Sequence, residues 1–125
     1  MADKTLLRLP KFAVALAAVV VVLGAYTRLA DAGLGCPDWP GCYGFFSVPE
    51  TAEEVLVAET RFPGAPVEPA KAWWEMVHRY FATSLGLVVL IIAGTAFAKR
   101  APTVPLKLPL ALLVLVIVQG AFGAW

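Results

Sequence analysis

Glu75, His78 and Arg79 are the group of residues in this sequence most suggestive of chemistry. Glu75 and His78 are three positions apart and Arg79 lies four positions after Glu75, so on a helix the three side chains share one face. A neutral imidazole is a good ligand for haem iron, and its second nitrogen needs a hydrogen-bonded partner that fixes the tautomer. The spacing is equally compatible with charged anchors at the end of a membrane helix, a place where ionisable residues are candidates for function.

Other metal sites are harder to build from this chain. Glu-x-x-His also occurs in di-iron carboxylate proteins, where glutamates on further helices complete the site, but the other two apolar segments contain no Glu or Asp. Arg28 and Arg79 lie at the ends of two apolar runs, and guanidinium groups there suit haem propionates, which they can grip bidentately. Haem therefore fits better than a di-iron centre, although the single histidine of the chain supplies only one axial ligand.

Cys36 and Cys42 lie six positions apart in GLGCPDWPGCYG, residues 33–44. A zinc site requires four ligands, and beyond these cysteines the chain offers only His78, so zinc is not expected. If the segment lies outside the cytoplasm, oxidising surroundings favour a disulfide between the two cysteines. We expect a structural staple. The alternative is a thiol pair that exchanges with a partner, but the spacing is not the Cys-x-x-Cys of thioredoxin-like proteins.

Membrane helices must position these groups, because the composition is that of a membrane protein. Of the 125 residues, 60% are hydrophobic and 15% are charged, whereas a soluble domain is about half apolar and a quarter charged. A net charge of +1 without a basic stripe gives no indication of nucleic-acid binding. A span needs roughly 17 to 25 largely apolar residues, which predicts an all-α membrane domain over residues 1–125 with three transmembrane helices at about 10–28, 75–98 and 106–125.

The distribution of charge predicts the orientation, because Lys and Arg gather in cytoplasmic loops. Basic residues precede the first span and fill the turn between the second and third: Lys4, Arg8, Lys11, Lys99, Arg100 and Lys107. From residue 31 to 75 there are eight acidic and two basic residues. We therefore expect a cytoplasmic N-terminus and an extracytoplasmic loop at about 29–72, rich in proline, with one short helix at TAEEVLVAE.

The first apolar run also has features of a secretory signal peptide. A basic start, an apolar stretch and Ala-Asp-Ala at residues 30–32 fit such a signal. The length of the run and Arg28 just before the cleavage point favour a retained helix. Small residues in the spans allow close helix packing, and Gln119, the only uncharged amide in the chain, is expected to form a helix–helix hydrogen bond, because an unpaired amide in lipid is costly.

Three segments together resemble the haem A synthase family. They are GAYTRLADAGLGCPDWPGCYG at residues 24–44, EMVHRYFATSLGL at 75–87 and QGAFGAW at 119–125. The resemblance implies a multi-pass protein of the bacterial inner membrane, built as two four-helix bundles, that oxidises the C8 methyl group of haem O to the formyl group of haem A. It implies that this chain forms three helices of the first bundle, which takes the substrate haem, whereas the second bundle holds a haem b cofactor.

The resemblance also implies roles for individual residues. His78 would be an axial ligand of the substrate haem, and Glu75 would be the acid beside it, required for turnover through proton handling or stabilisation of a cationic intermediate. Arg28 and Arg79 match motif arginines that would contact the haem propionates or Glu75. Cys36 and Cys42 match the outer-loop cysteine pair of one branch of the family.

The chain departs from the family pattern in length. The fourth helix, with the partner histidine, and the second bundle are not among these residues, so we expect the incomplete N-terminal half of a longer enzyme, inactive alone, or helices supplied by other chains. The expected partners are haem O, haem O synthase, oxidase assembly factors or copies of the same chain. The alternative function is a non-catalytic membrane protein whose stapled outer loop binds an oxidase assembly partner. Haem binding through His78 would distinguish the two.

Overall fold

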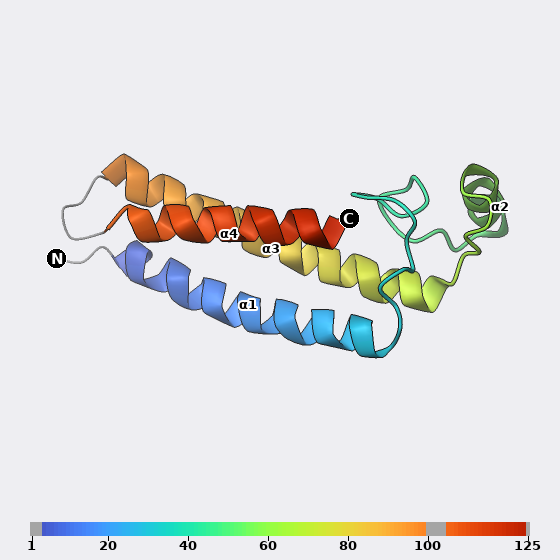
Figure 1. Cartoon of the computed structure of the whole chain (residues 1–125), viewed down its shortest axis with the longest axis horizontal. Helices are drawn as coiled ribbons and strands as arrows, with labels where there is room; N and C mark the ends of the chain where they lie inside the picture. Colours follow the sequence, from blue (N-terminus) through green and yellow to red (C-terminus); the bar gives the residue numbers. More distant parts are fainter. Residues whose placement is uncertain (1–3, 100–104, 125) are drawn as a thin grey trace. The chain divides into compact units, whose positions relative to one another are not determined.

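The computed structural model describes residues 4–99 and 105–124. Within these ranges it contains four helices, which are α1 (Lys4–Leu29), α2 (Ala52–Arg61), α3 (Pro69–Lys99) and α4 (Lys107–Ala124) (Figure 1). Three of them, α1, α3 and α4, have the length and hydropathy to cross a membrane. The predicted all-α membrane protein with three spans is therefore confirmed, and the predicted short helix in the loop is α2.

The helices are longer at their polar ends than the apolar runs suggest. Helix α3 begins at Pro69 rather than near residue 75, because proline suits the first helical position, where its missing N–H is not needed. Helix α1 begins at Lys4 rather than near residue 10. The segment connecting α1 to α3, residues 30–68, is correspondingly shorter than predicted, and it is called the connecting segment below. Arg100 and Trp125, predicted to lie in a turn and a span, are outside the described residues.

The chain divides into two compact units, and α1 and α3 each run through both. Unit 1 combines residues Met1–Val20 and Phe81–Trp125, and unit 2 is Val21–Tyr80. In unit 1 the start of α1, the end of α3 and the start of α4 lie at the same end of the unit (Figure 1). The basic residues at these helix ends therefore lie at one end of unit 1, in agreement with the predicted orientation. That this end faces the cytoplasm stays a prediction.

Helix packing in unit 1 uses small residues at few positions. A Cβ added to Gly86 of α3 would lie 3.7 Å from Val116 Cγ1 of α4, so these two helices are in contact there. Gly94 and Gly120, also expected to pack closely, have no atom within 4 Å of such a Cβ. Gln119 is exposed, and no hydrogen bond of its amide is among the described contacts, so the expected helix–helix bond is not observed.

Unit 2 has a hydrophobic core that joins the connecting segment, α2 and the start of α3. Its buried members are Cys36, Cys42, Tyr43, Val48, Ala58, Ala72 and Met76. Two hydrogen bonds tie the connecting segment to α3 from outside this core: Trp73 Nε1 donates to Glu50 Oε1 at 2.5 Å, and Tyr80 Oη donates to the Phe46 carbonyl at 2.7 Å. The connecting segment is therefore fixed along about two turns of α3.

Helix α2 starts at a capping box. The Thr51 hydroxyl accepts a hydrogen bond from Glu54 N at 3.2 Å, and Glu54 Oε2 accepts from Thr51 N at 3.1 Å. The same carboxylate oxygen also accepts from Glu50 N at 3.1 Å. These bonds satisfy N–H groups that a helix start leaves unpaired, which explains why ten residues form a helix inside a proline-rich segment.

Candidate functional site: a carboxylate held by a disulfide ring

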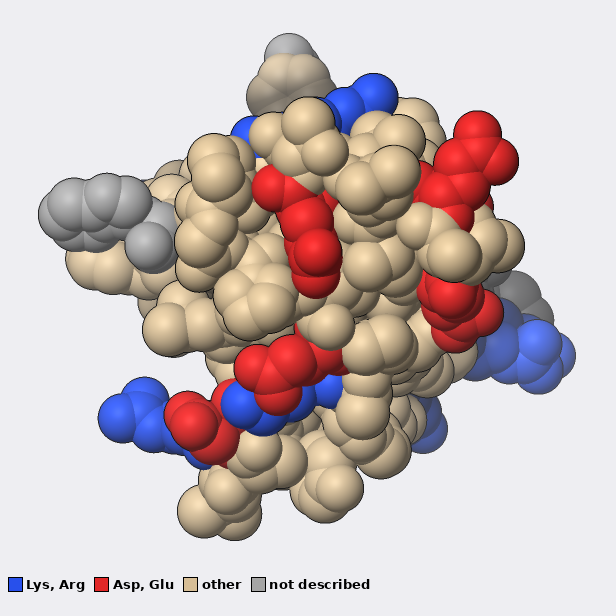
Figure 2. Space-filling model, turned by 90° about the vertical axis from the view of Figure 1, so that its right-hand side faces the viewer, with Lys and Arg blue, Asp and Glu red and all other residues tan. Residues whose placement is uncertain are grey.

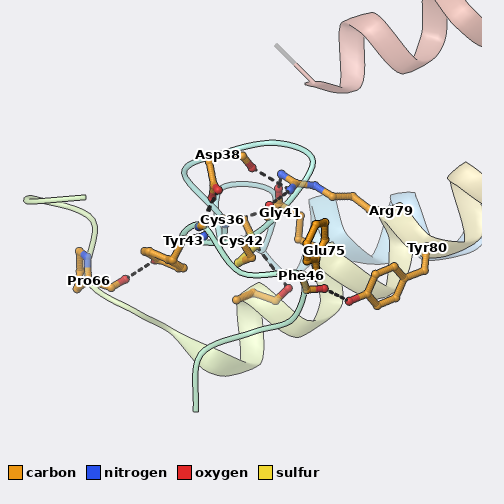
Figure 3. Close-up of a disulfide and its surroundings, with 12 residues drawn as sticks. Cys36, Asp38, Gly41, Cys42, Tyr43, Phe46, Pro66, Glu75, Arg79 and Tyr80 are labelled. Atoms are coloured by element: carbon orange, nitrogen blue, oxygen red, sulfur yellow. Dashed lines mark hydrogen bonds and ion pairs between the residues drawn. A yellow bond between two sulfur atoms is a disulfide. The ribbon is translucent and has the colours of Figure 1, made fainter. Parts of the chain in front are cut away.

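The first half of α3 carries the three residues singled out for their spacing. Glu75 is buried, and His78 and Arg79 are half-buried. All three belong to unit 2, as do Arg28 and the two cysteines. Figure 3 shows Glu75 and Arg79 directed toward the loop that contains the cysteines.

Cys36 and Cys42 form the predicted disulfide. Their sulfur atoms are 2.08 Å apart and their Cα atoms 4.8 Å apart, which closes residues 36–42 into a loop called the disulfide ring below. The Asp38 carboxylate folds the chain where it leaves the ring, because it accepts hydrogen bonds from Tyr43 N at 2.5 Å and Gly44 N at 2.8 Å. Gly44 has a φ of 80°, a left-handed conformation that glycine adopts without steric cost.

Both oxygens of the Glu75 carboxylate have partners that connect to the ring. Oε2 accepts a hydrogen bond from Cys36 N at 3.1 Å, and Oε1 forms an ion pair with Arg79 Nη2. Arg79 Nη1 in turn donates to the carbonyls of Asp38 at 2.9 Å and Gly41 at 2.6 Å (Figure 3). A buried carboxylate is costly unless it is paired and hydrogen-bonded. Here Arg79, which two ring carbonyls hold, supplies the ion pair, and the Cys36 peptide N–H supplies the hydrogen bond. The helical spacing predicted the contact between Glu75 and Arg79, but it could not predict the ring.

His78 faces α1 at a glycine. A Cβ added to Gly24 would lie 2.9 Å from His78 Nε2, so the absence of a side chain at Gly24 leaves the space that the imidazole occupies. Glycine in a helix costs about 0.5–1 kcal/mol relative to alanine, and this contact accounts for its presence. The Glu75 oxygens are directed at Cys36 and Arg79, and no hydrogen bond between this carboxylate and His78 is among the described contacts.

Arg28 lies apart from this network. It is in the last turn of α1 and is exposed, and no ion pair of its side chain is among the described contacts. Two residues earlier, the Tyr26 ring lies 4.4 Å from the Trp74 ring, centroid to centroid, which fixes the end of α1 against α3. Of the two arginines expected to contact Glu75, the structure brings only Arg79 to it. Within residues 4–99 and 105–124, no three His, Cys, Asp or Glu side chains come together as a metal-binding group.

The surroundings of the ring are acidic. Figure 2 shows carboxylates distributed over the face that unit 2 presents. Tyr43, next to the ring, is buried and donates a hydrogen bond from its hydroxyl to the Pro66 carbonyl at 2.9 Å. Burial, and then the carboxylates of Glu68 and Glu59, raise the pKa of the Tyr43 phenol above its usual value of about 10. The phenol therefore stays protonated and keeps its hydrogen bond over the whole neutral range.

Comparison with known proteins identifies the family. The family model of the COX15-CtaA cytochrome oxidase assembly proteins matches residues 8–125. The chain belongs to this family. The matched range includes most of α1, all of α3 and α4, the disulfide ring and the Glu75–Arg79 pair.

Curated relatives of this family member bear one name. The chain is 52% identical over 107 residues to the Heme A synthase of Shewanella oneidensis, a match that covers 86% of this chain and 32% of the relative. It is 35% identical over 122 residues to the Heme A synthase of Sinorhizobium fredii, covering 85% of this chain and 32% of that protein. The chain thus spans about a third of the length of these relatives. No solved structure matches it.

Proposed function

We propose that this chain forms part of the substrate-haem half of a haem A synthase, which oxidises the C8 methyl group of haem O to the formyl group of haem A. The observation that carries the proposal is the 52% identity over 107 residues to a protein named Heme A synthase. The geometry supports it, because His78 lies one helical turn from a buried carboxylate in a membrane-spanning helix, the kind of position where ionisable residues serve function.

In this proposal His78 provides one axial nitrogen to the iron of the substrate haem. The chain has a single histidine, so its residues fit one axial position, and a second ligand comes from outside these 125 residues. Haem iron supplies redox chemistry when bound, and the chain supplies orientation. No residue of this chain is assigned to the haem b cofactor, which in this proposal belongs to the other half of the enzyme.

Glu75 and the two arginines then have separate roles. Glu75 lies beside the substrate and either handles a proton or stabilises positive charge during turnover. Arg79 is engaged by Glu75 and by two ring carbonyls, so it holds the carboxylate. Arg28, which is exposed at the end of α1, is the arginine left to contact a haem propionate, which a guanidinium can grip bidentately.

The proposed location is the bacterial inner membrane, with the N-terminus in the cytoplasm and the connecting segment outside. Three apolar helices and the shared side of the basic helix ends support it. In the oxidising compartment outside the cytoplasm the Cys36–Cys42 disulfide persists. The exposed, acidic connecting segment is then available to haem O synthase or to oxidase assembly factors.

The first test is a haem titration of the purified chain in detergent without added imidazole, because free imidazole ligates haem iron itself and would hide the loss of His78. We expect wild type and Thr83→Ala, an exposed substitution on the same helix, to give a saturable shift of the Soret band and His78→Ala to lose it. Binding of equal affinity in all three would overturn the ligand assignment. A folded chain that binds no haem at all would favour the non-catalytic, partner-binding alternative.

The contact between Gly24 and His78 gives a second test of the same assignment. The methyl group of Gly24→Ala would meet Nε2 at 2.9 Å and would have to displace the imidazole. Overpacking of this kind costs about 1–3 kcal/mol, so we expect haem affinity to fall about tenfold. Gly94→Ala is the matched control, because a Cβ there meets nothing within 4 Å, and it should bind haem as wild type does.

A further inference from the structure

Gly35, the residue before the disulfide ring, lies against the backbone of α3. A Cβ added to Gly35 would come within 2.7 Å of both Ala72 N and the Lys71 carbonyl carbon, and within 2.8 Å of the Lys71 carbonyl oxygen. The described glycines with positive φ are Gly44 and Gly64, so Gly35 is needed for space and not for an unusual conformation. Helix backbone atoms cannot rotate aside as a side chain can, so a larger residue at Gly35 must move the chain away from α3.

The close approach at Gly35 places the next peptide group on Glu75. Cys36 N is 3.1 Å from Glu75 Oε2, and the carbonyls of Asp38 and Gly41 hold the guanidinium that pairs with Glu75 Oε1. Each oxygen of the carboxylate is thus fixed, one directly and one through Arg79, by backbone groups of the same seven-residue loop (Figure 3). A loop that served only to stiffen the connecting segment would not need to contact both oxygens.

We infer that the disulfide ring is a positioning device for the Glu75 carboxylate, and that Gly35 is the positioning residue that seats the ring on α3. This inference rests on the proposed function of Glu75 in turnover. Peptide N–H and C=O groups inside a covalently closed loop have few alternative positions, so they fix the carboxylate more firmly than flexible side chains would. A misplacement of about 1 Å in a reacting geometry can cost about a hundredfold in rate, so small movements of the ring should be visible in turnover.

The test compares Gly35→Ala with Gly33→Ala, introduced into the gene in its source organism. Gly33 lies two residues earlier, is exposed, and a Cβ there meets nothing within 4 Å. The measurements are haem A and haem O in membrane extracts, the amount of the protein, and the spectrum of the haem bound to it. We expect Gly35→Ala to lower haem A per protein about tenfold to a hundredfold with bound haem and the disulfide retained, and Gly33→Ala to behave as wild type.

Hydrogen exchange of the Cys36 amide in the purified protein reports whether the ring has moved. If Gly35→Ala accelerates this exchange yet leaves haem A unchanged, the positioning inference is overturned. If Gly35→Ala does not accumulate, Arg79→Lys replaces it, because a lysine keeps the positive charge beside Glu75 but cannot reach two ring carbonyls with a fixed planar group. Unchanged haem A in Arg79→Lys would also contradict the inference.

Glu75→Gln separates this inference from the proposed function. If Glu75→Gln leaves haem A unchanged, the proposed role of Glu75 is wrong and the positioning inference falls with it. If Glu75→Gln abolishes haem A formation and Gly35→Ala does not lower it, only the positioning inference is overturned. Loss of turnover in both, with haem still bound, supports both.

Discussion

The two units of this chain satisfy their side chains in different ways. In unit 2, Cys42, Ala58 and Ala72 are 0% exposed, and a buried carboxylate has partners on both oxygens. In α4 of unit 1, Pro109 is the one buried residue among those described. The apolar side chains of α4 are therefore left to contact lipid or further helices. Within a membrane the hydrophobic effect does not drive such side chains together, because the acyl chains around them are equally apolar.

This difference indicates where the structure of the chain is specified. Unit 2 is held by contacts among its own residues, including a disulfide and side-chain hydrogen bonds across 23 to 41 positions of sequence. Unit 1 is specified by helix length, hydropathy and the basic residues at its ends. Equivalent substitutions in the two units of the isolated chain should therefore lower the local stability by different amounts.

The largest difference is expected between Met76→Ala and Leu115→Ala. Met76 is 1% exposed in the core of unit 2, whereas Leu115 of α4 is 55% exposed. Truncation of a buried Met to Ala costs about 2–5 kcal/mol, and truncation of an exposed residue about 0.5 kcal/mol or less. Native-state hydrogen exchange of amides in the connecting segment and in α4, measured in detergent, gives both values. Equal losses would show that the isolated α4 is packed as tightly as unit 2.

Removal of the disulfide is expected to have the next largest effect. In Cys36→Ser with Cys42→Ser the closed loop of seven residues is lost, and loop-closure entropy for a ring of this size amounts to about 2 kcal/mol. The same exchange measurement should show the loss in residues of the ring and α2 and leave α4 unchanged. Because the cysteines are only 6% and 0% exposed, the wild-type disulfide should resist mild reductant. Rapid reduction in the folded chain would contradict the staple and favour thiol exchange.

The comparison also shows what the sequence could predict. Hydropathy located α1, α3 and α4, since each contains a single long apolar run, and the segment TAEEVLVAE was the expected place of α2. The i, i+4 spacing predicted that Arg79 would contact Glu75, because on a helix this distance is fixed by local geometry. The cysteine pair predicted its own disulfide, because prolines and a glycine between the cysteines make a small loop easy to close and oxidising surroundings favour the bond.

The contacts that complete the site depend on tertiary structure and have no local signal. Cys36 N and Glu75 are 39 positions apart, and their contact exists because the chain reverses after α1 and passes Gly35 against α3. Arg28, by contrast, is exposed at the end of α1 and makes no described contact with Glu75, an outcome that the sequence left open. Gly24 is one of the small residues of the first apolar run, and only the structure relates it to His78.

A smaller effect is expected from the Tyr43 hydroxyl. Tyr43→Phe removes its hydrogen bond to the Pro66 carbonyl, a loss of about 1 kcal/mol in unit 2. Tyr26→Phe is the control, since Tyr26 is 46% exposed and contacts Trp74 through its ring. Because burial raises the pKa of the Tyr43 phenol in the folded state, its contribution is complete below the usual pKa of about 10 and is lost as the pH rises through the higher folded value.

This pH dependence can be followed through the local free energy of opening of the connecting segment, measured between pH 8 and 11. Wild type should lose local stability in the upper part of this range, and Tyr43→Phe should lose less of it. A wild type and a Tyr43→Phe variant with parallel alkaline curves would show that another group titrates there. Residues 108–124 of α4 provide an internal reference, because none of their side chains ionises in this range.

The smallest effect is expected at the start of α2. Peptide N–H groups of Glu50 and Thr51 donate to the Glu54 carboxylate and lower its pKa. A lowered folded pKa means that the stabilisation is present above the usual pKa of a glutamate and is lost as the pH falls through the lower folded value. We therefore expect α2 amides to exchange faster, relative to the rest of unit 2, below about pH 4.

Glu54→Gln should show this faster exchange at neutral pH already, whereas Glu53→Gln, in the same first turn, should not. Because α2 packs into the unit 2 core through Ala58, an acid-induced opening confined to its first turn would mean that the core, rather than the capping box, holds the helix in place.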